Sequence, residues 1–239
     1  MSAALAELRA ALPRAPRPAP AALRTGLGAV DDHLPGGGFG AGTHEVWPGP
    51  GGAPSEAAAA LFAAHALASG SGPVIWALRR RDLFAPALAE AGLAPARVIY
   101  AEAGDEASVL AVTEEALRHG GLAGVVAETT RLSLKASRRL QLAAEATGTA
   151  CFVLRRPRPG QQESAGTACL TRWRITSAPS RAAHGLPRAS WHAELTRCRG
   201  GQPRAWQLEV DDGASPHRLR LAETVAAGAA VADAGRRAA

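Results

Sequence analysis

Short apolar runs alternate with helix-forming segments between residues 44 and 156, and this alternation constrains the fold more than any other feature of the sequence. The runs have the length of β-strands, and the segments between them have the length of helices. The alternation predicts an α/β fold with a mostly parallel sheet, right-handed crossovers and helices on both faces. The expected strands cover 44–47, 73–78, 96–103, 121–129 and 149–156, and the expected helices cover 55–69, 82–92, 105–119 and 133–147.

The pattern changes after residue 156. A polar, glycine-containing stretch at 157–169 precedes three segments, 170–179, 190–200 and 204–210, in which apolar and polar residues alternate. Alternation with a period of two is typical of antiparallel strands with one solvated face. We therefore expect an antiparallel strand extension at the edge of the parallel sheet.

The chain of 239 residues suits one large α/β domain with additional segments at its ends. We predict an N-terminal helix and proline-rich linker at 1–20, a main domain at 21–221 and an alanine-rich C-terminal tail at 222–239. The repeated prolines of 13–20 favour an extended linker over helix or sheet. The N-terminal helix would be too short to be stable without a surface to cover.

The composition favours a cytoplasmic protein. No apolar stretch approaches the ~18 residues of a membrane span, and the first residues mix Arg, Glu and Pro where a signal peptide has its apolar segment. Cys151, Cys169 and Cys198 are odd in number and widely spaced, so they predict neither a disulfide framework nor a zinc site. We expect free thiols in a reducing compartment, and no metal and no cofactor.

The net charge is +6, and Lys135 is the only lysine, so the positive charge is almost entirely arginine. A GC-rich genome, which favours arginine codons, would account for part of this bias. Guanidinium forks also suit phosphate and carboxylate groups, so nucleic acid or an acidic protein surface is a plausible partner.

The most informative segment is LRTGLGAVDDHLPGGGFGAGTHEVWPGPGG at 23–52. Its short apolar-periodic stretch, glycine turn, strand and second glycine turn resemble the entry to the RecA recombinase core, and the resemblance extends over about 23–210. Within that superfamily, RLSLKASRRLQLAAEATGTACFVLRRPR at 131–158, followed by TRWRI and APS, resembles the ImuA family.

The resemblance implies an accessory role in SOS-induced translesion DNA synthesis. The implied partners are an ImuB-like protein, which is an inactive Y-family polymerase homologue, and an error-prone C-family DNA polymerase. The resemblance also implies contact with RecA itself, weak sequence-independent contact with DNA, and self-association. No partner in a membrane is implied.

A working phosphate loop reads G-x-x-x-x-G-K-[ST], in which backbone N–H groups, a lysine and a hydroxyl hold the phosphates and Mg²⁺. The corresponding stretch here retains glycines and then departs at three consecutive positions. Its members are Gly49, Gly51, Gly52, Pro54, Ser55 and Glu56. Pro54 has no N–H, Ser55 has no charge, and Glu56 would repel phosphate. We interpret the stretch as a strand-to-helix turn that has lost its nucleotide chemistry.

The acidic and basic residues near the expected strand ends support the same interpretation. Glu128 closes the Walker B-like strand, but without a phosphate loop we expect it to cap or pair locally. The RecA catalytic glutamate corresponds to Arg79 and Arg80, and a guanidinium cannot act as a base.

Arginines surround the loop after residue 156, at the position that faces DNA in RecA-like proteins. The candidate DNA or partner contacts are Arg155, Arg156, Arg158, Arg172, Arg174, Arg138 and Arg139. They would neutralise phosphates in a salt-dependent way, or they form a solvated basic edge in an arginine-rich protein. The sequence favours neither of these two interpretations over the other.

The sequence leaves two alternatives to a non-catalytic adaptor. One is a divergent NTPase of the RecA class that binds nucleotide unconventionally. The other is a SulA-like inhibitor of cell division, which shares the architecture but would not need the polar loop and the late strands.

The changes at Pro54, Ser55 and Glu56 predict that the purified protein neither binds nor hydrolyses ATP. The missing lysine and hydroxyl leave the phosphates and Mg²⁺ without their usual partners. Titration of ATP with Mg²⁺, followed calorimetrically, should show no saturable binding. Saturation at micromolar ATP would contradict the interpretation of the loop.

Overall fold

The computed structural model describes residues 22–158, 160–161, 166–179, 189–211 and 218–223. The expected helix at 2–12, the linker at 13–20 and the tail beyond residue 223 lie outside the described residues.

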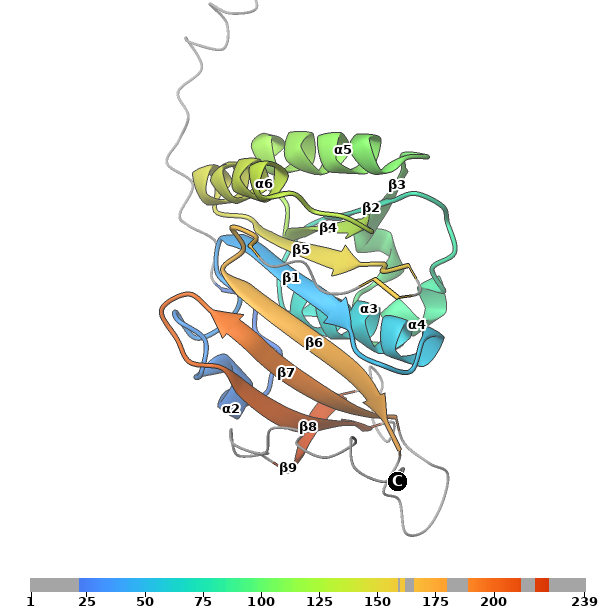
Figure 1. Ribbon diagram of the computed structural model, residues 1–239, viewed down its shortest axis with the longest axis vertical. Helices are drawn as coiled ribbons and strands as arrows, with labels where there is room; N and C mark the ends of the chain where they lie inside the picture. The colour runs from blue at the N-terminus through green and yellow to red at the C-terminus, as the bar shows by residue number, and fades with distance from the viewer. Residues whose placement is uncertain (1–21, 159, 162–165, 180–188, 212–217, 224–239) are drawn as a thin grey trace, which may run out of the picture.

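A nine-stranded sheet in the order β3-β2-β4-β5-β1-β6-β7-β8-β9 forms the centre of the molecule (Figure 1). The strands from β3 to β6 in this order pair in parallel, and the remaining strands pair antiparallel. This confirms the predicted parallel sheet with an antiparallel extension. The strand bounds are β1 Gly42–Pro48, β2 Val74–Leu78, β3 Val98–Glu102, β4 Gly124–Thr129, β5 Ala150–Arg155, β6 Thr171–Ala178, β7 Ser190–Cys198, β8 Arg204–Asp211 and β9 Arg218–Glu223.

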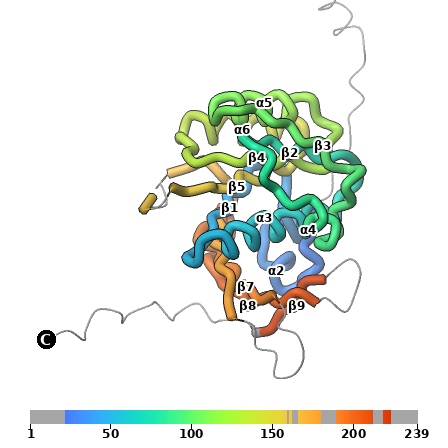
Figure 2. Tube along the Cα trace, turned by 90° about the vertical axis from the view of Figure 1, so that its right-hand side faces the viewer, coloured from blue at the N-terminus to red at the C-terminus, as the bar shows by residue number. Residues whose placement is uncertain are grey.

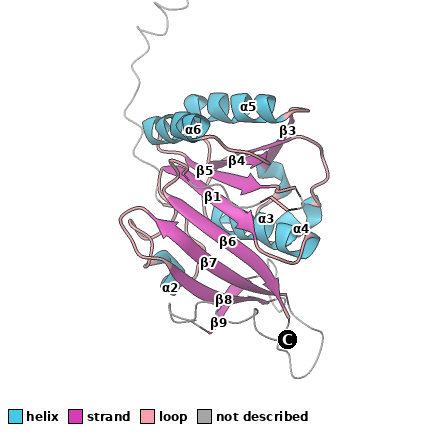
Figure 3. Cartoon of the chain, in the orientation of Figure 1, coloured by secondary structure: helices cyan, strands magenta, loops and turns pink. Residues whose placement is uncertain are grey.

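Helices cover both faces of the sheet, as the sequence predicts (Figures 1 and 2). On one face α5 and α6 lie side by side, and on the other lie α3, α4 and the short α2. The helix bounds are α2 Gly28–Asp31, α3 Ala53–Ala68, α4 Ala85–Glu90, α5 Glu106–His119 and α6 Leu134–Thr147, with a 3-10 turn η1 at Pro95–Arg97. Figure 3 shows how the antiparallel strands extend beyond the region that α5 and α6 cover.

The helices begin where the sequence offers a cap. The side chains of Asp105 and Ser133 accept hydrogen bonds from the backbone N–H groups of Ser108 and Ala136, which satisfies donors in the first turns of α5 and α6. Gly148 ends α6 in the left-handed conformation, with φ of 74°. These local signals explain why the bounds of α5 and α6 match the predicted ranges 105–119 and 133–147 within a residue or two.

The larger apolar cluster lies between the sheet and the α3 face. Phe39 is its centre, because its ring contacts those of Phe62, Phe152 and Trp173 with centroids 5.0 to 6.0 Å apart. Trp173 stacks in turn on Trp206 of β8, at 5.7 Å. The aromatic chain therefore joins the parallel half of the sheet to its antiparallel half.

Two features of the extension differ from the prediction. β6 pairs in parallel with β1 and antiparallel only with β7, so it joins the two halves of the sheet. A further strand, β9, pairs with β8 beyond residue 210, where the sequence suggested no strand. β9 also runs past residue 221, so the predicted domain end at 221 cuts through it. Short edge strands such as this carry little periodic signal.

The parallel strands place their carboxyl ends at one edge of the sheet. The ends of β1, β2, β4 and β5 therefore meet, and the loops that follow them lie near one another. This edge carries the candidate site. No helix within the described ranges has both the length and the apolar character that crossing a bilayer requires.

We predict that ending the chain at Asp211 lowers the free energy of unfolding by about 2 kcal/mol or more, because Leu219 and Leu221 of β9 then leave the core. Urea denaturation of the truncated chain and of a chain ending at Glu223 measures the difference. The longer chain keeps all of β9 and should match the full-length protein. Equal midpoints for all three chains would show that β9 adds nothing to stability.

Candidate functional site

The loop between β1 and α3 occupies the place of the phosphate loop, but its glycines serve the packing of the sheet. The backbone N–H of Gly49 donates to the carbonyl of Ile175 in β6, at 2.7 Å. A Cβ at Gly49 would lie 1.8 Å from Thr176 Oγ1. Gly52 has φ of 64° and is the residue before α3. Glycine is therefore favoured at Gly49 by the close approach of Thr176 and at Gly52 by a positive φ.

Ser55 closes this loop from inside. Its buried hydroxyl donates to the carbonyl of Pro50 at 2.6 Å and accepts from the backbone N–H of Ser177 at 3.0 Å. A phosphate loop needs a lysine at this position that reaches outward to the phosphates. Pro54 precedes it in the first turn of α3 and offers no N–H. The loop is thus bound to β6 by its own side chain.

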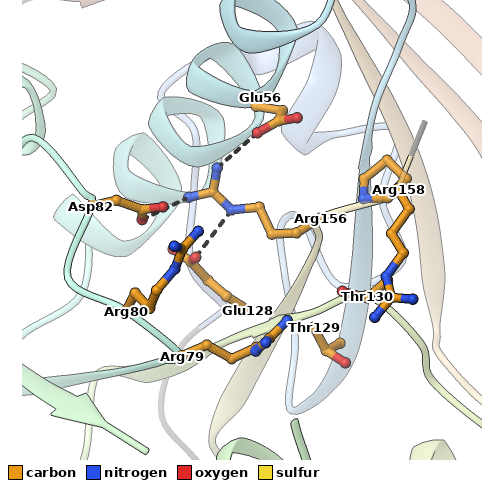
Figure 4. A pocket seen from close by; sticks show the side chains of 10 residues that line it. Glu56, Arg79, Arg80, Asp82, Glu128, Thr129, Thr130, Arg156 and Arg158 are labelled. Carbon is orange, nitrogen blue, oxygen red and sulfur yellow. Dashed lines mark hydrogen bonds and ion pairs between the residues drawn. The ribbon is translucent and has the colours of Figure 1, made fainter. Parts of the chain in front are cut away.

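Arg156, the residue after β5, is the centre of the site (Figure 4). Its Nε lies 3.0 Å from Glu128 Oε2, and its Nη1 lies 3.1 Å from Glu56 Oε2. Its Nη2 lies 4.0 Å from Asp82 Oδ1 in the loop after β2. The guanidinium is therefore surrounded by carboxylates from three separate segments.

Glu128 is the last residue but one of β4, and its partners come from distant parts of the chain. Besides Arg156, its carboxylate accepts a hydrogen bond from Trp76 Nε1 at 2.8 Å. The side chain is only 7% exposed, so its charge requires both partners. This carboxylate therefore belongs to the internal ion network.

Electrostatics keep Arg156 charged. Burial by itself would lower the pKa of Arg156, but the carboxylates of Glu128, Asp82 and Glu56 outweigh it and raise that pKa above its ordinary value. A permanent cation thus stands between the helix that follows the phosphate-loop position and the strand that ends in Glu128. Lysine and Mg²⁺ supply positive charge at such places in competent NTPases.

A cavity of 310 Å³ opens beside this cluster at the carboxyl edge of the sheet. Arg79 and Arg80 line one part of it, and Arg158 lines another (Figure 4). All three are exposed. Arg79 and Arg80 therefore stand near the place where the RecA resemblance puts a catalytic glutamate, and no general base is present in their side chains.

Arg155, one of the predicted DNA contacts, lies in the interior of the protein. Its side chain is 1% exposed, its Nη2 donates to the carbonyl of Thr130 at 2.9 Å, and its guanidinium lies over the Trp47 ring at 4.7 Å. Burial lowers the pKa of Arg155, although Glu45, 3.6 Å from its Nε, opposes this. Arg155 holds the interior together and does not face solvent.

The other predicted contacts separate into paired and exposed residues. Arg172 Nε lies 3.0 Å from the buried Glu45, and Arg174 lies 2.9 Å from Glu194, its cross-strand neighbour on β7. Arg139 forms an ion pair with Glu114 of α5. Arg138 and Arg158 are exposed.

Of the predicted basic residues, the structure places Arg156 and Arg158 in the lining of the cavity. Arg138 and Arg139 lie on α6, which covers one face of the sheet. The predicted contacts therefore do not form one surface.

Sequence reasoning missed two carboxylates of this region, Glu45 and Asp82. Glu45 is fully buried in β1 and accepts hydrogen bonds from Trp47, Thr167 and Arg172. An acidic residue inside the apolar run HEVW was a signal of a buried ion pair. Asp82 gave no such signal, since it lies in a polar loop.

Among the described residues, no group of three or more His, Cys, Asp or Glu side chains is placed to hold a metal ion. The three carboxylates around Arg156 hold a guanidinium. Cys151, Cys169 and Cys198 are free thiols. Burial raises the pKa of Cys151 and Cys169, so neither is poised as a thiolate.

The fold is that of a RecA-like domain. The solved structure of the RadB recombinase is similar, with a TM-score of 0.58 and 15% identity, over 78% of this chain and 95% of that chain. Protein ImuA of Caulobacter vibrioides strain NA1000 / CB15N is 40% identical over 231 residues, which cover 90% of this chain and 95% of the relative, and ImuA of strain ATCC 19089 / CIP 103742 / CB 15 gives the same values. The chain belongs to the ImuA family. No protein-family model matches it.

We predict that Arg156→Met lowers the free energy of unfolding by about 2–3 kcal/mol, because it leaves the buried Glu128 without a cation. The double variant E128Q/R156M should recover part of this loss, since the amide still accepts from Trp76 and carries no charge. Chemical denaturation of the wild type, both single variants and the double variant gives the coupling energy. Additive effects of the two changes would contradict a direct interaction.

Proposed function

We propose that this chain is a non-catalytic accessory protein of SOS-induced translesion DNA synthesis. It assembles in the cytoplasm with an ImuB-like inactive Y-family polymerase and an error-prone C-family polymerase. Family membership supports the first part of this proposal, because the 40% identity to ImuA extends over 90% of the chain.

The non-catalytic part rests on one observation above all. Arg156 occupies the space among Glu56, Asp82 and Glu128, where a nucleotide-hydrolysing relative would need room for phosphate and Mg²⁺. The closure of the neighbouring loop by Ser55 supports the same inference. An adaptor needs neither a general base nor a metal. The salt bridges of Arg156 instead hold the segments around it in place.

A divergent NTPase is the second candidate, because the RecA-like fold and a carboxylate at Glu128 are retained. In such an enzyme Glu128 would have to leave Arg156 and take up a metal. The two candidates therefore differ in how Glu128→Gln behaves. An enzyme loses activity with this change, whereas a scaffold keeps the shape of the side chain and its bond to Trp76.

The test is co-purification of the tagged full-length chain with the ImuB-like protein and the C-family polymerase of the same organism. We expect a complex that forms equally with and without ATP and Mg²⁺, because no step of assembly uses nucleotide. The Glu128→Gln variant should assemble like the wild type and should restore damage-induced mutagenesis to a deletion strain. An ATP-dependent complex, or failure of Glu128→Gln in a folded protein, would favour the NTPase. Absence of any complex would reject the adaptor.

A further inference from the structure

Three exposed arginines at the carboxyl edge of the sheet are not used by the internal ion network. Arg79 and Arg80 follow β2, and Arg158 follows β5. All three line the 310 Å³ cavity beside Arg156. We call these three residues the arginine rim.

The rim is not neutralised by neighbouring carboxylates. Within the described part of the chain, no carboxylate oxygen lies within 4.0 Å of the guanidinium groups of the rim. Arg79 acts through space on Asp105, whose pKa is lowered chiefly by hydrogen bonds from Ser108 and in smaller part by this arginine. The acidic residues of the cavity, Glu56, Asp82 and Glu128, are instead gathered around Arg156. These three carboxylates therefore pair with Arg156 and not with the rim.

The hollow at this edge extends beyond one cavity. A second cavity of 550 Å³ is lined by Trp47, Gly52, Gly160 and other residues of the loops after β1 and β5. Both cavities share Glu56, Pro157 and Arg158 in their linings. Arg158 therefore stands where the two hollows adjoin, with Arg79 and Arg80 at the far side of the first. This shape suits an extended ligand better than a compact one.

The rim also differs from a nucleotide site in its donors. The backbone N–H of Gly49 is bonded to β6, Pro54 has no N–H, and the Ser55 hydroxyl is bonded on both sides. The donors that the rim offers to an anion are side-chain guanidinium forks, which match the geometry of phosphate oxygens. A row of such forks along a groove is the arrangement that follows a phosphodiester backbone.

We infer that the arginine rim of Arg79, Arg80 and Arg158 binds phosphate groups of a nucleic acid backbone, independently of base sequence. This inference rests on the proposed function for its setting in DNA synthesis and replaces the predicted contact through Arg155, which is buried. Arg156 positions the rim by holding the acidic groups of the cavity. The bound strand lies across the carboxyl edge of the sheet.

The test uses the full-length protein and a fluorescent oligothymidylate of about 20 nucleotides, with binding followed by anisotropy at several salt concentrations. The rim variant is Arg79→Gln/Arg80→Gln/Arg158→Gln. The control variant, Arg118→Gln/Arg218→Gln/Arg220→Gln, removes the same charge from exposed side chains on α5 and β9. Thermal melting of both variants verifies that they are folded.

We expect the rim variant to bind about tenfold more weakly or worse, and its slope of log affinity against log salt to fall by about 2. The control should stay within about threefold of the wild type. Equal losses in both variants would overturn the proposal, because they would show attraction by net charge alone. Absence of binding by the wild type at low salt would also overturn it.

A competition experiment identifies the source of the phosphate. Inorganic pyrophosphate, added to the wild-type complex, should displace the oligonucleotide only at concentrations at which chloride of equal ionic strength does so. Displacement at micromolar pyrophosphate would overturn the nucleic acid ligand in favour of a small free phosphate. Co-purification of the rim variant with the ImuB-like partner is measured in parallel, so loss of DNA binding is separated from failure of the adaptor.

Discussion

The ion cluster around Arg156 is the interaction on which the candidate site depends. One guanidinium is shared by Glu56 at the start of α3, Asp82 after β2 and Glu128 at the end of β4. These segments all lie at the carboxyl edge of the parallel strands. Because Arg156 is attached to β5, the protein itself supplies the cation that joins them. The edge of the sheet therefore has its shape without a ligand.

The same cluster is also connected to the hydrophobic core. Glu128 accepts a hydrogen bond from the buried Trp76, whose ring belongs to the core between the sheet and α3. Next to it, Arg155 extends the network through Trp47 and Glu45 to Arg172 of β6. Arg155 is the last residue of β5 and Arg156 follows it, so their side chains point to opposite sides of the sheet. Buried charges of this kind are costly to disrupt, and here they connect side chains of β1, β5 and β6.

The division of the arginines has a functional consequence. Arginines that are paired inside stabilise the scaffold, whereas some of the exposed arginines have no carboxylate within 4.0 Å in the described part of the chain. Arg79, Arg80 and Arg158 are in the second group because Arg156 has taken the nearby carboxylates. The ion cluster of Arg156 thus lies directly beneath an exposed basic edge.

The sequence by itself determined the succession of strands and helices, because each rests on local periodicity and on caps such as Asp105 and Ser133. It also showed that Pro54, Ser55 and Glu56 depart from the phosphate-loop pattern. The tertiary structure decided which arginines are available. Arg155 and Arg156 are neighbours in one motif, yet one is buried and the other joins Glu56, 100 residues away along the chain, to Glu128. Such partners are brought together by the parallel pairing of distant strands, and no local pattern of residues encodes which charges will meet.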